Sequence, residues 1–173
     1  MPVTVDDFLS KAELSALNEW VLSENNSIYF QCSGMGSKRK TTRYSKNVSF
    51  PKEALLAKKR ISEKTGLTKS IDHYCEGIIA SFAPPDDSGV YLHKDKNSLN
   101  DVVSVHCNIV TSHQEKGGTL FFGKEEIATK ENQLMCYPVS EVEHGVSSIS
   151  GNKHRILWIF GFYANKENLK DWL

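Results

Sequence analysis

The spacing of hydrophobic residues changes along the chain, and it predicts helices only in the segment before residue 70. A capping-box pattern at residues 10–13, Ser-Lys-Ala-Glu, precedes apolar residues that recur every three or four positions. This pattern predicts an amphipathic helix over residues 11–23. A second helix is expected from near Pro51, which suits the first turn of a helix, to near Gly66. Between the two helices, residues 27–33 are expected to form a strand.

From residue 73 onward, short runs rich in β-branched and aromatic residues alternate with turn residues, as is typical of strands. Helices followed by many strands argue against an alternating βαβ fold. They favour a mainly β protein, a sandwich or jelly roll with helices packed on one outer face. The expected strands cover residues 73–83, 102–111, 118–122, 133–138, 143–149 and 154–163.

The length of 173 residues suits one domain with one sizeable core. Within this single domain, 1–173, we expect supporting helices and a loop over residues 1–70. The β-rich core is expected over residues 71–163, and a polar tail with a helical turn over residues 164–173.

Composition and charge narrow the class of protein. The formal net charge is zero, which does not favour a nucleic-acid-binding surface. No segment approaches the roughly 20 apolar residues of a membrane span.

The four cysteines form no C-x-x-C pair, so neither a zinc site nor a disulfide framework is predicted. Free thiols and a start without a signal-peptide pattern predict a cytoplasmic protein. The oligomeric state stays open.

Residues 37–46 form a polar segment that carries five lysines and arginines. Such runs are most often solvated loops. The alternatives are a surface that binds an acidic peptide or RNA, and a lid over a substrate.

The sequence His93-Lys94-Asp95 is the first pattern with chemical meaning. In a strand, residues two apart point to the same side, so His93 and Asp95 can bind one metal ion together. A third ligand is expected from another strand, at His144. Two imidazoles and one carboxylate form the facial triad of non-haem iron oxygenases, which leaves positions open for a co-substrate and O₂. The H-x-D pattern alone is weak, because a His and an Asp at the exposed end of a strand look the same.

Three further patterns strengthen this interpretation. Arg155 opens the apolar strand expected over residues 154–163, and a buried guanidinium there needs an anionic partner such as a carboxylate. Gly117 and Gly118 precede an apolar strand and indicate a tight turn or a close approach of backbone. Residues 134–138 are expected to form a buried strand ahead of the loop that carries the third ligand.

The order H-x-D, G-G-x-x-x-F, H-G-V and Arg resembles the 2-oxoglutarate/Fe(II) oxygenases of the prolyl-hydroxylase-like group. These motifs are residues 93–95, 117–122, 144–146 and Arg155, and the resemblance covers about residues 74–163. It implies a double-stranded β-helix, a cupin-like jelly roll buttressed by helices on one sheet. It also implies Fe(II), 2-oxoglutarate and O₂ as cofactor and co-substrates, with ascorbate as a possible stimulant.

The resemblance also implies roles for individual residues. His93, Asp95 and His144 would be the catalytic metal ligands, and Arg155 would pair with the distal carboxylate of 2-oxoglutarate. Leu120 matches a leucine of the oxygen-sensing prolyl hydroxylases. Since collagen-type enzymes usually carry Lys where this chain has Arg155, the resemblance favours the oxygen-sensing branch.

The chain departs from that branch at two positions. A tyrosine that contacts 2-oxoglutarate aligns near Phe82, and an aromatic residue that lines the substrate proline aligns with Gly161. Tyr91 shares a strand face with His93 and is a candidate wall of the substrate pocket, although core packing would explain it equally well.

The remaining histidines and cysteines have structural interpretations. His106 and His113 lack metal-ligand spacing and are expected to be structural. His154 is expected to point away from the side of its strand that carries the site, because neighbouring residues alternate. Cys107 and Cys136 are expected in the core.

The expected reaction is hydroxylation of a C–H bond, first of all in a prolyl residue of a protein or peptide, with release of succinate and CO₂. The carboxylate of Asp95 argues against a halogenase, which carries a small residue there. Nucleic-acid demethylases carry a second Arg where this chain has Gly161, so a nucleic-acid partner is not expected. The alternatives are a hydroxylase of a free amino acid or small metabolite, and a catalytically inert cupin-like binding module.

Overall fold

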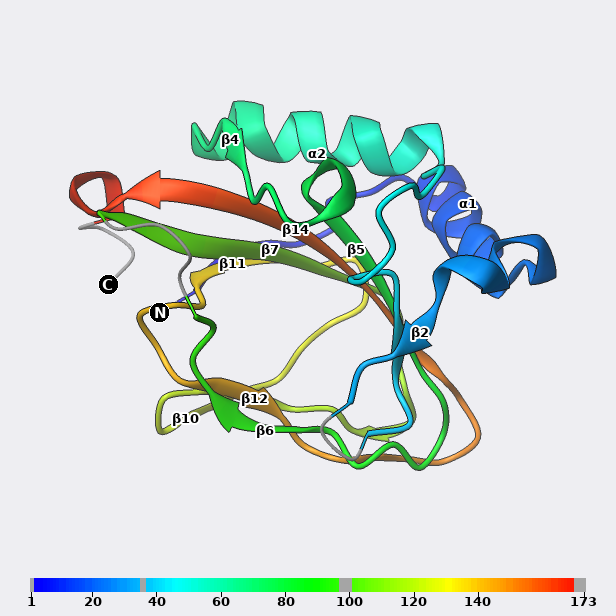
Figure 1. The fold of residues 1–173 in the computed structure, drawn as a ribbon. Helices are drawn as coiled ribbons and strands as arrows, with labels where there is room; N and C mark the ends of the chain where they lie inside the picture. The colour runs from blue at the N-terminus through cyan, green and yellow to red at the C-terminus, as the bar shows by residue number, and fades with distance from the viewer. Residues whose placement is uncertain (1, 35–36, 97–100, 170–173) are drawn as a thin grey trace.

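Two antiparallel sheets face each other in the computed structural model, which describes residues 2–34, 37–96 and 101–169 (Figure 1). The strands of the large sheet are, in spatial order, β1 (Val3–Val5), β11 (Leu134–Pro138), β7 (Val102–Ser112), β14 (Arg155–Asn165), β5 (Ile78–Ala83), β3 (Lys40–Thr41) and β2 (Gln31–Cys32), and β4 (Lys69–Ser70) pairs with β14.

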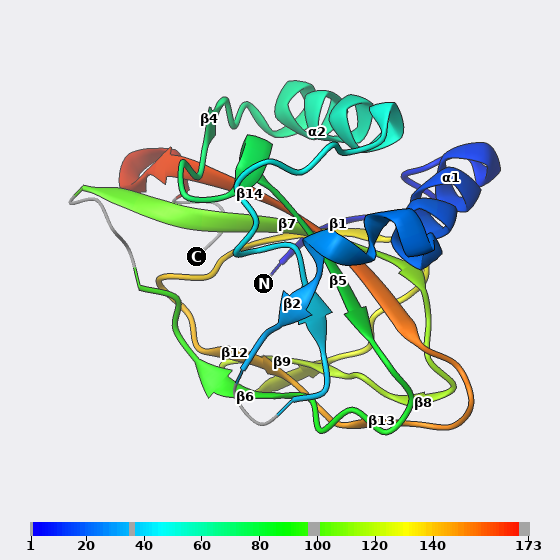
Figure 2. The same ribbon diagram turned by 45° about the vertical axis from the view of Figure 1, so that its right-hand side comes forward.

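The small sheet lies opposite the large one, and the two are joined by the loops at their ends (Figure 2). Its strands are, in spatial order, β10 (Glu125–Ile127), β9 (Leu120–Phe122), β12 (His144–Val146) and β6 (Val90–His93), and the separate pair β13 (Ile149–Ser150) and β8 (Lys116–Gly117) closes one end. The arrangement is the expected jelly roll.

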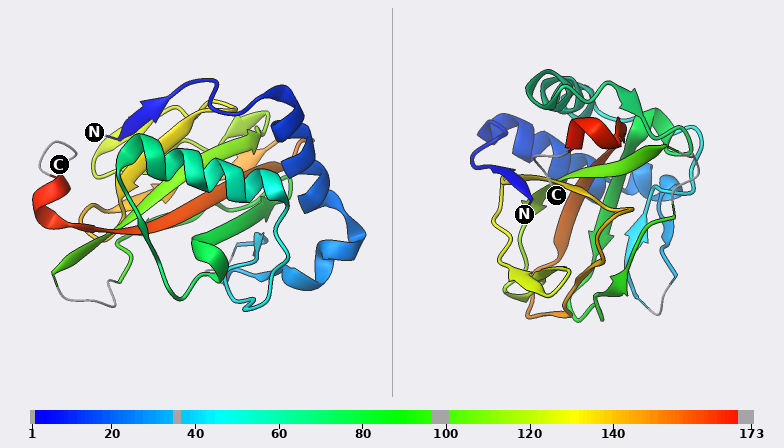
Figure 3. Two further views of the ribbon diagram at one scale, coloured as in Figure 1. Left: turned by 90° about the horizontal axis from the view of Figure 1, so that it is seen from above. Right: turned by 90° about the vertical axis from the view of Figure 1, so that its left-hand side faces the viewer.

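Both long helices cover the outer face of the large sheet, as the order of elements predicts. Helix α1 (Lys11–Leu22) and helix α2 (Lys52–Thr65) lie on the same side of it (Figures 1 and 3). The capping box is present at the start of α1, and α2 ends at Gly66 in a left-handed conformation. The expected helix boundaries are therefore confirmed to within one or two residues.

Alternation along β14 divides the large sheet into a core face and a site face. Trp158, Phe160 and Phe162 are fully buried and pack in one cluster with the apolar residues of the helices. Arg155, Leu157 and Ile159 lie on the opposite face of the strand and line the cavity. The helices thus hold one face of β14 rigid, and the opposite face is free to build a cavity.

Four sequence-based expectations on secondary structure need correction. The strand expected over residues 143–149 is divided into β12 and β13, which belong to different sheets. The strand expected over residues 27–33 is a 3₁₀ helix at Glu24–Tyr29 followed by the two-residue strand β2. The ring of Tyr29 stacks on Trp20, with centroids 6.1 Å apart, so the 3₁₀ helix continues the packing of α1, and only β2 pairs in the sheet.

Residues 73–77 form a turn and a short 3₁₀ helix ahead of β5, and they bend where Glu76 adopts a φ of 53°. Strand β14 continues two residues further than expected, to Asn165. The helical turn expected in the tail is present at Lys166–Leu169, and residues 170–173 lie outside the described part of the chain.

No helix within the described ranges combines the length and hydropathy that crossing a membrane requires.

Candidate metal centre

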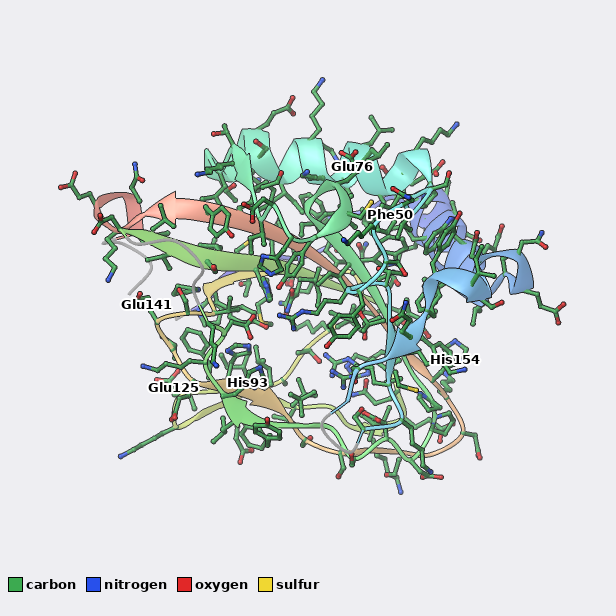
Figure 4. The ribbon with its side chains drawn as sticks, in the orientation of Figure 1. Phe50, Glu76, His93, Glu125, Glu141 and His154 are labelled. Atoms are coloured by element: carbon green, nitrogen blue, oxygen red, sulfur yellow. The ribbon has the colours of Figure 1, made fainter. Side chains whose placement is uncertain are left out.

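Three side chains with metal-binding atoms meet on the inner side of the small sheet. His93 ends β6, Asp95 follows two residues later, and His144 begins β12 directly opposite His93 in the antiparallel pair. The ligand atoms of the three residues all lie within 4.8 Å of one another. Figure 4 shows His93 on this strand, between the two sheets. The structure therefore brings together all three residues of the expected triad.

Backbone carbonyls fix the direction of both imidazoles. The Nδ1 atom of His93 lies 2.9 Å from the carbonyl oxygen of Tyr91, and Nδ1 of His144 lies 3.2 Å from that of Val142. An Nδ1–H group that donates to a carbonyl leaves Nε2 as the lone-pair donor for a metal. The backbone N–H of Asp95 donates to the Val139 carbonyl at 3.0 Å, which holds the loop after β6 in place.

The electrostatics of the metal-free site favour an ionised carboxylate. Burial alone would raise the pKa of Asp95, but hydrogen bonding to His93 and the positive charge of Arg43 help to hold it well below its usual value. The hydrogen bond to Asp95 in turn raises the pKa of His93 above 6.5, whereas burial lowers the pKa of His144. The two groups are close enough for an ion pair when His93 is protonated, because Nε2 of His93 lies 3.3 Å from Oδ1 of Asp95.

His106 belongs to this site, although its spacing along the chain gave it a structural interpretation. Its Nε2 atom lies 3.6 Å from Oδ2 of Asp95 and 3.2 Å from the hydroxyl oxygen of Tyr74. Burial lowers the pKa of His106 to about 3, so the imidazole is neutral at physiological pH. It is a supporting neighbour of the triad. His106 lies on the face of β7 that lines the site, in register with Gly161 of β14. The alternation of residues along β7 was the sequence signal that could have placed it there.

A buried cation lies at another part of the same cavity. Arg155 is 4% exposed, its Nη1 donates to the Gly118 carbonyl at 3.1 Å, and its Nε has no hydrogen-bond partner among the residues that the structure describes. Burial lowers the pKa of Arg155 to about 10, so the guanidinium keeps its charge at neutral pH. A buried charge with an unsatisfied donor fits an anionic ligand that supplies the missing acceptor.

The glycine pair sets this position, as the sequence indicates. Both Gly117 and Gly118 have positive φ angles, 77° and 70°. A Cβ at Gly117 would overlap the carbonyl oxygen of Ser148, and one at Gly118 would overlap Gln114. The turn can therefore bring its backbone against Arg155 only without side chains. Leu120 follows it, 4% exposed, and lines the cavity.

One cavity contains the triad, Arg155 and Leu120 in its walls. Tyr91 is not among the residues that line it. Its side chain is 62% exposed, and its ring meets His93 edge-on with centroids 5.7 Å apart. Tyr91 would therefore contact a substrate only at the rim.

The basic segment is not wholly a solvated loop. Lys38, Lys40 and Lys46 are exposed, but Arg39 and Arg43 line the cavity. Part of this segment thus forms a wall of the cavity that contains the triad. The spacing of residues alone did not predict this arrangement.

Solved structures with the same fold come from proteins with low sequence identity to this chain. A viral collagen prolyl hydroxylase from Paramecium Bursaria Chlorella virus-1, in complex with 2-oxoglutarate, is 18% identical over 95% of this chain and 96% of that one, with a TM-score of 0.67. A prolyl hydroxylase from Trichoplax adhaerens, in complex with a hypoxia inducible factor peptide fragment, is 15% identical over 96% and 84%, with a TM-score of 0.67. HygX from Streptomyces hygroscopicus, with nickel and 2-oxoglutarate bound, is 9% identical over 95% and 83%, with a TM-score of 0.65.

No family model and no curated protein sequence matches the chain. The likeness to solved structures confirms the expected double-stranded β-helix, the fold shared by these oxygenases. The two prolyl hydroxylases have equal TM-scores, so the comparison favours neither the collagen-type nor the oxygen-sensing branch.

Proposed function

We propose that this protein is an Fe(II)- and 2-oxoglutarate-dependent dioxygenase that hydroxylates a C–H bond. One observation carries the proposal: a His-Asp-His triad and a buried arginine with an unsatisfied donor line the same cavity. The donor set of two imidazoles and one carboxylate suits Fe(II) and leaves coordination positions free. His93, Asp95 and His144 would hold the iron, which supplies O₂ activation when bound.

The protein's own residues bind and orient the co-substrate. Arg155 would receive the distal carboxylate of 2-oxoglutarate as a charge-assisted pair. Leu120 forms an apolar wall beside the co-substrate, and the burial of Arg155 keeps water from competing for the carboxylate. The carbonyl-bound Nδ1 atoms of His93 and His144 keep both imidazoles in the tautomer that the metal requires.

A prolyl residue in a protein or peptide is the first candidate substrate. The support is the fold shared with prolyl hydroxylases, one of them in complex with a peptide. A small metabolite is the second candidate, because a similar structure, HygX, has been solved with hygromycin B bound. The oxygen-sensing branch suggested by Arg155 remains a prediction.

Anaerobic calorimetry with Mn(II) in place of Fe(II) tests the co-substrate. The wild-type protein should bind 2-oxoglutarate only after metal is added, and His144→Ala should not. Absence of 2-oxoglutarate binding by the metal-loaded wild type would favour an inert cupin-like module. With Fe(II) and O₂, the prolyl substrate is then tested by succinate release and by a mass increase of about 16 Da, one oxygen atom, in proline-containing peptides.

A further inference from the structure

The cavity is lined by more positive than negative side chains. Among the described residues, four basic side chains line it, Arg39, Arg43, Lys130 and Arg155, and Asp95 is the one lining carboxylate. A cluster of cations in a partly buried cavity repels itself unless anions neutralise it. The partner of each cation therefore indicates what the cavity is built to bind.

Two of the four cations have an ion-pair partner in the structure, and a third has a proposed one. Arg39 pairs with the fully buried carboxylate of Asp87 at 3.3 Å, and Lys130 pairs with Asp6 at 3.3 Å near the surface. Arg155 has the role of co-substrate anchor in the proposed function. These three leave Arg43 to be explained.

Arg43 is positioned close to the metal centre by an aromatic ring. Its guanidinium carbon lies 5.5 Å from the centroid of the Tyr74 ring, within cation–π range. The hydroxyl of Tyr74 contacts His106, which in turn lies beside Asp95. The backbone N–H of Arg43 donates to Thr41 Oγ1 at 3.2 Å, which fixes the start of the side chain.

The guanidinium of Arg43 has no ion pair or hydrogen bond with the described part of the chain, since its one hydrogen bond is made by the backbone. The face of the Tyr74 ring holds the planar group but satisfies none of its N–H donors. Its fork is therefore available to an acceptor in the cavity.

Asp95 acts on Arg43 only at longer range, since the two side chains form no ion pair in the structure, and in the loaded site its charge would be shared with the metal. In the proposed function, the distal carboxylate of 2-oxoglutarate would pair with Arg155, and the metal would neutralise its remaining charge. The positive charge of Arg43 is left without a counter-charge at the part of the cavity next to the triad.

We infer that Arg43 binds a carboxylate of the substrate, so that the preferred substrate is acidic close to the carbon that is hydroxylated. This inference rests on the proposed function and makes it more specific. A planar carboxylate matches the fork of Arg43 through two parallel hydrogen bonds. The carboxylate has two sources, an acidic side chain next to the target residue or the free α-carboxylate of an amino acid.

Two matched sets of ligands test the inference whichever residue is the target. The first is a pair of capped tripeptide libraries that vary the central residue and carry Glu or Gln beside it. The second is the set of free amino acids and their amides. Binding is measured by anaerobic calorimetry to protein loaded with Mn(II) and 2-oxoglutarate, in the wild type and in Arg43→Gln, Arg43→Lys and Lys46→Gln.

The wild type should bind the acidic member of one set at least about tenfold tighter than its neutral match, the factor that corresponds to one charge-assisted hydrogen bond. Arg43→Gln should lose this preference, and Arg43→Lys should keep part of it. Lys46→Gln should behave as wild type, because Lys46 is an exposed cation of the same segment that does not line the cavity. A preference in the peptide libraries identifies an acidic side chain, and a preference for free amino acids identifies an α-carboxylate.

Equal binding of acidic and neutral ligands by the wild type, or binding of neither set, would overturn the inference. An acidic preference that survives in Arg43→Gln would also overturn it. The affinity for 2-oxoglutarate separates these results from failure of the proposed function. That affinity should be unchanged in Lys46→Gln, and its absence from the wild type would count against the proposed function itself.

Discussion

The ring of Tyr74 fills the space beside Gly161 that any larger residue at that position would need. A Cβ at Gly161 would lie 2.9 Å from both Cδ2 and Cε2 of the Tyr74 ring, and also 2.9 Å from Cδ1 of Ile71. The resemblance to prolyl hydroxylases places an aromatic residue of β14 at this position. In the structure, an aromatic ring from the segment before β5 lies next to it. The hydroxyl of Tyr74 also contacts His106, so the packing of this ring against Gly161 helps to position His106 beside the candidate metal site.

Gly161→Ala should therefore destabilise the fold by about 1–3 kcal/mol, because overpacking forces the Tyr74 ring to move. Urea denaturation measures this change in the free energy of unfolding. The double variant with Tyr74→Ala is the control: the two effects should be less than additive, since removal of the ring creates room for the methyl group. Strict additivity would show that Gly161 is constrained by something other than Tyr74.

His93→Ala or His144→Ala should abolish tight metal binding and turnover while the fold is kept. Both side chains lie at the inner side of the small sheet, away from the cluster that packs under the helices. Calorimetry with Mn(II) and circular dichroism provide the two measurements. His154→Ala is a matched control, because that histidine is absent from the triad. Full activity in either triad variant would remove that residue from the ligand set.

Arg155→Ala should weaken binding of 2-oxoglutarate by about 2–4 kcal/mol, the cost of losing one partner of a buried charged pair. The effect should appear in the KM for 2-oxoglutarate and in anaerobic binding. Arg155→Lys retains the charge without the planar fork and should lose less. An unchanged affinity in Arg155→Ala would refute this role for the residue.

Metal affinity should fall as pH decreases through the pKa of His93. A protonated imidazole cannot bind a metal, so protons compete with the ion. The hydrogen bond with Asp95 raises the pKa of His93 above 6.5, so the loss should begin above that pH, and affinity should be complete at higher pH. Burial lowers the pKa of His144, which should therefore lose its proton first as pH rises.

Two measurements check this order. NMR titration of the metal-free protein should give a pKa above 6.5 for His93 and below 6.5 for His144. Calorimetry with Mn(II) between about pH 5.5 and 8 should show proton release that follows the titration of His93. The reverse order of the two histidines would contradict the arrangement of charges around Asp95.

The sequence predicted the parts of the site that depend on spacing within one segment. His93 ends β6 and Asp95 follows two residues later, and the turn at Gly117 and Gly118 is possible because both glycines lack a side chain. His106 was not recognised as part of the site, and Arg43 was considered only within the basic segment 37–46, for which a substrate lid was one alternative. The importance of both residues comes from contacts between segments distant in the chain. Hydrophobic periodicity describes which face of a strand is buried, but it contains no information on which loop lies against that face.

Short strands were harder to predict for a similar reason. A two-residue strand such as β2 has no measurable alternation, and its pairing with β3 is decided by the position of the neighbouring strand β5. Long elements with many repeats, such as β14 and α2, were predicted nearly in full because each repeat adds to the pattern.

The carboxylate of Asp87 has a consequence for how a substrate enters. It accepts hydrogen bonds from the hydroxyl of Ser37 at 2.6 Å and the backbone N–H of Lys38 at 2.8 Å, besides its pair with Arg39. One buried anion thus anchors residues 37–39, part of the basic segment that lines the cavity, to the barrel. A ligand then meets a pre-organised opening, and little conformational entropy remains to be lost on association.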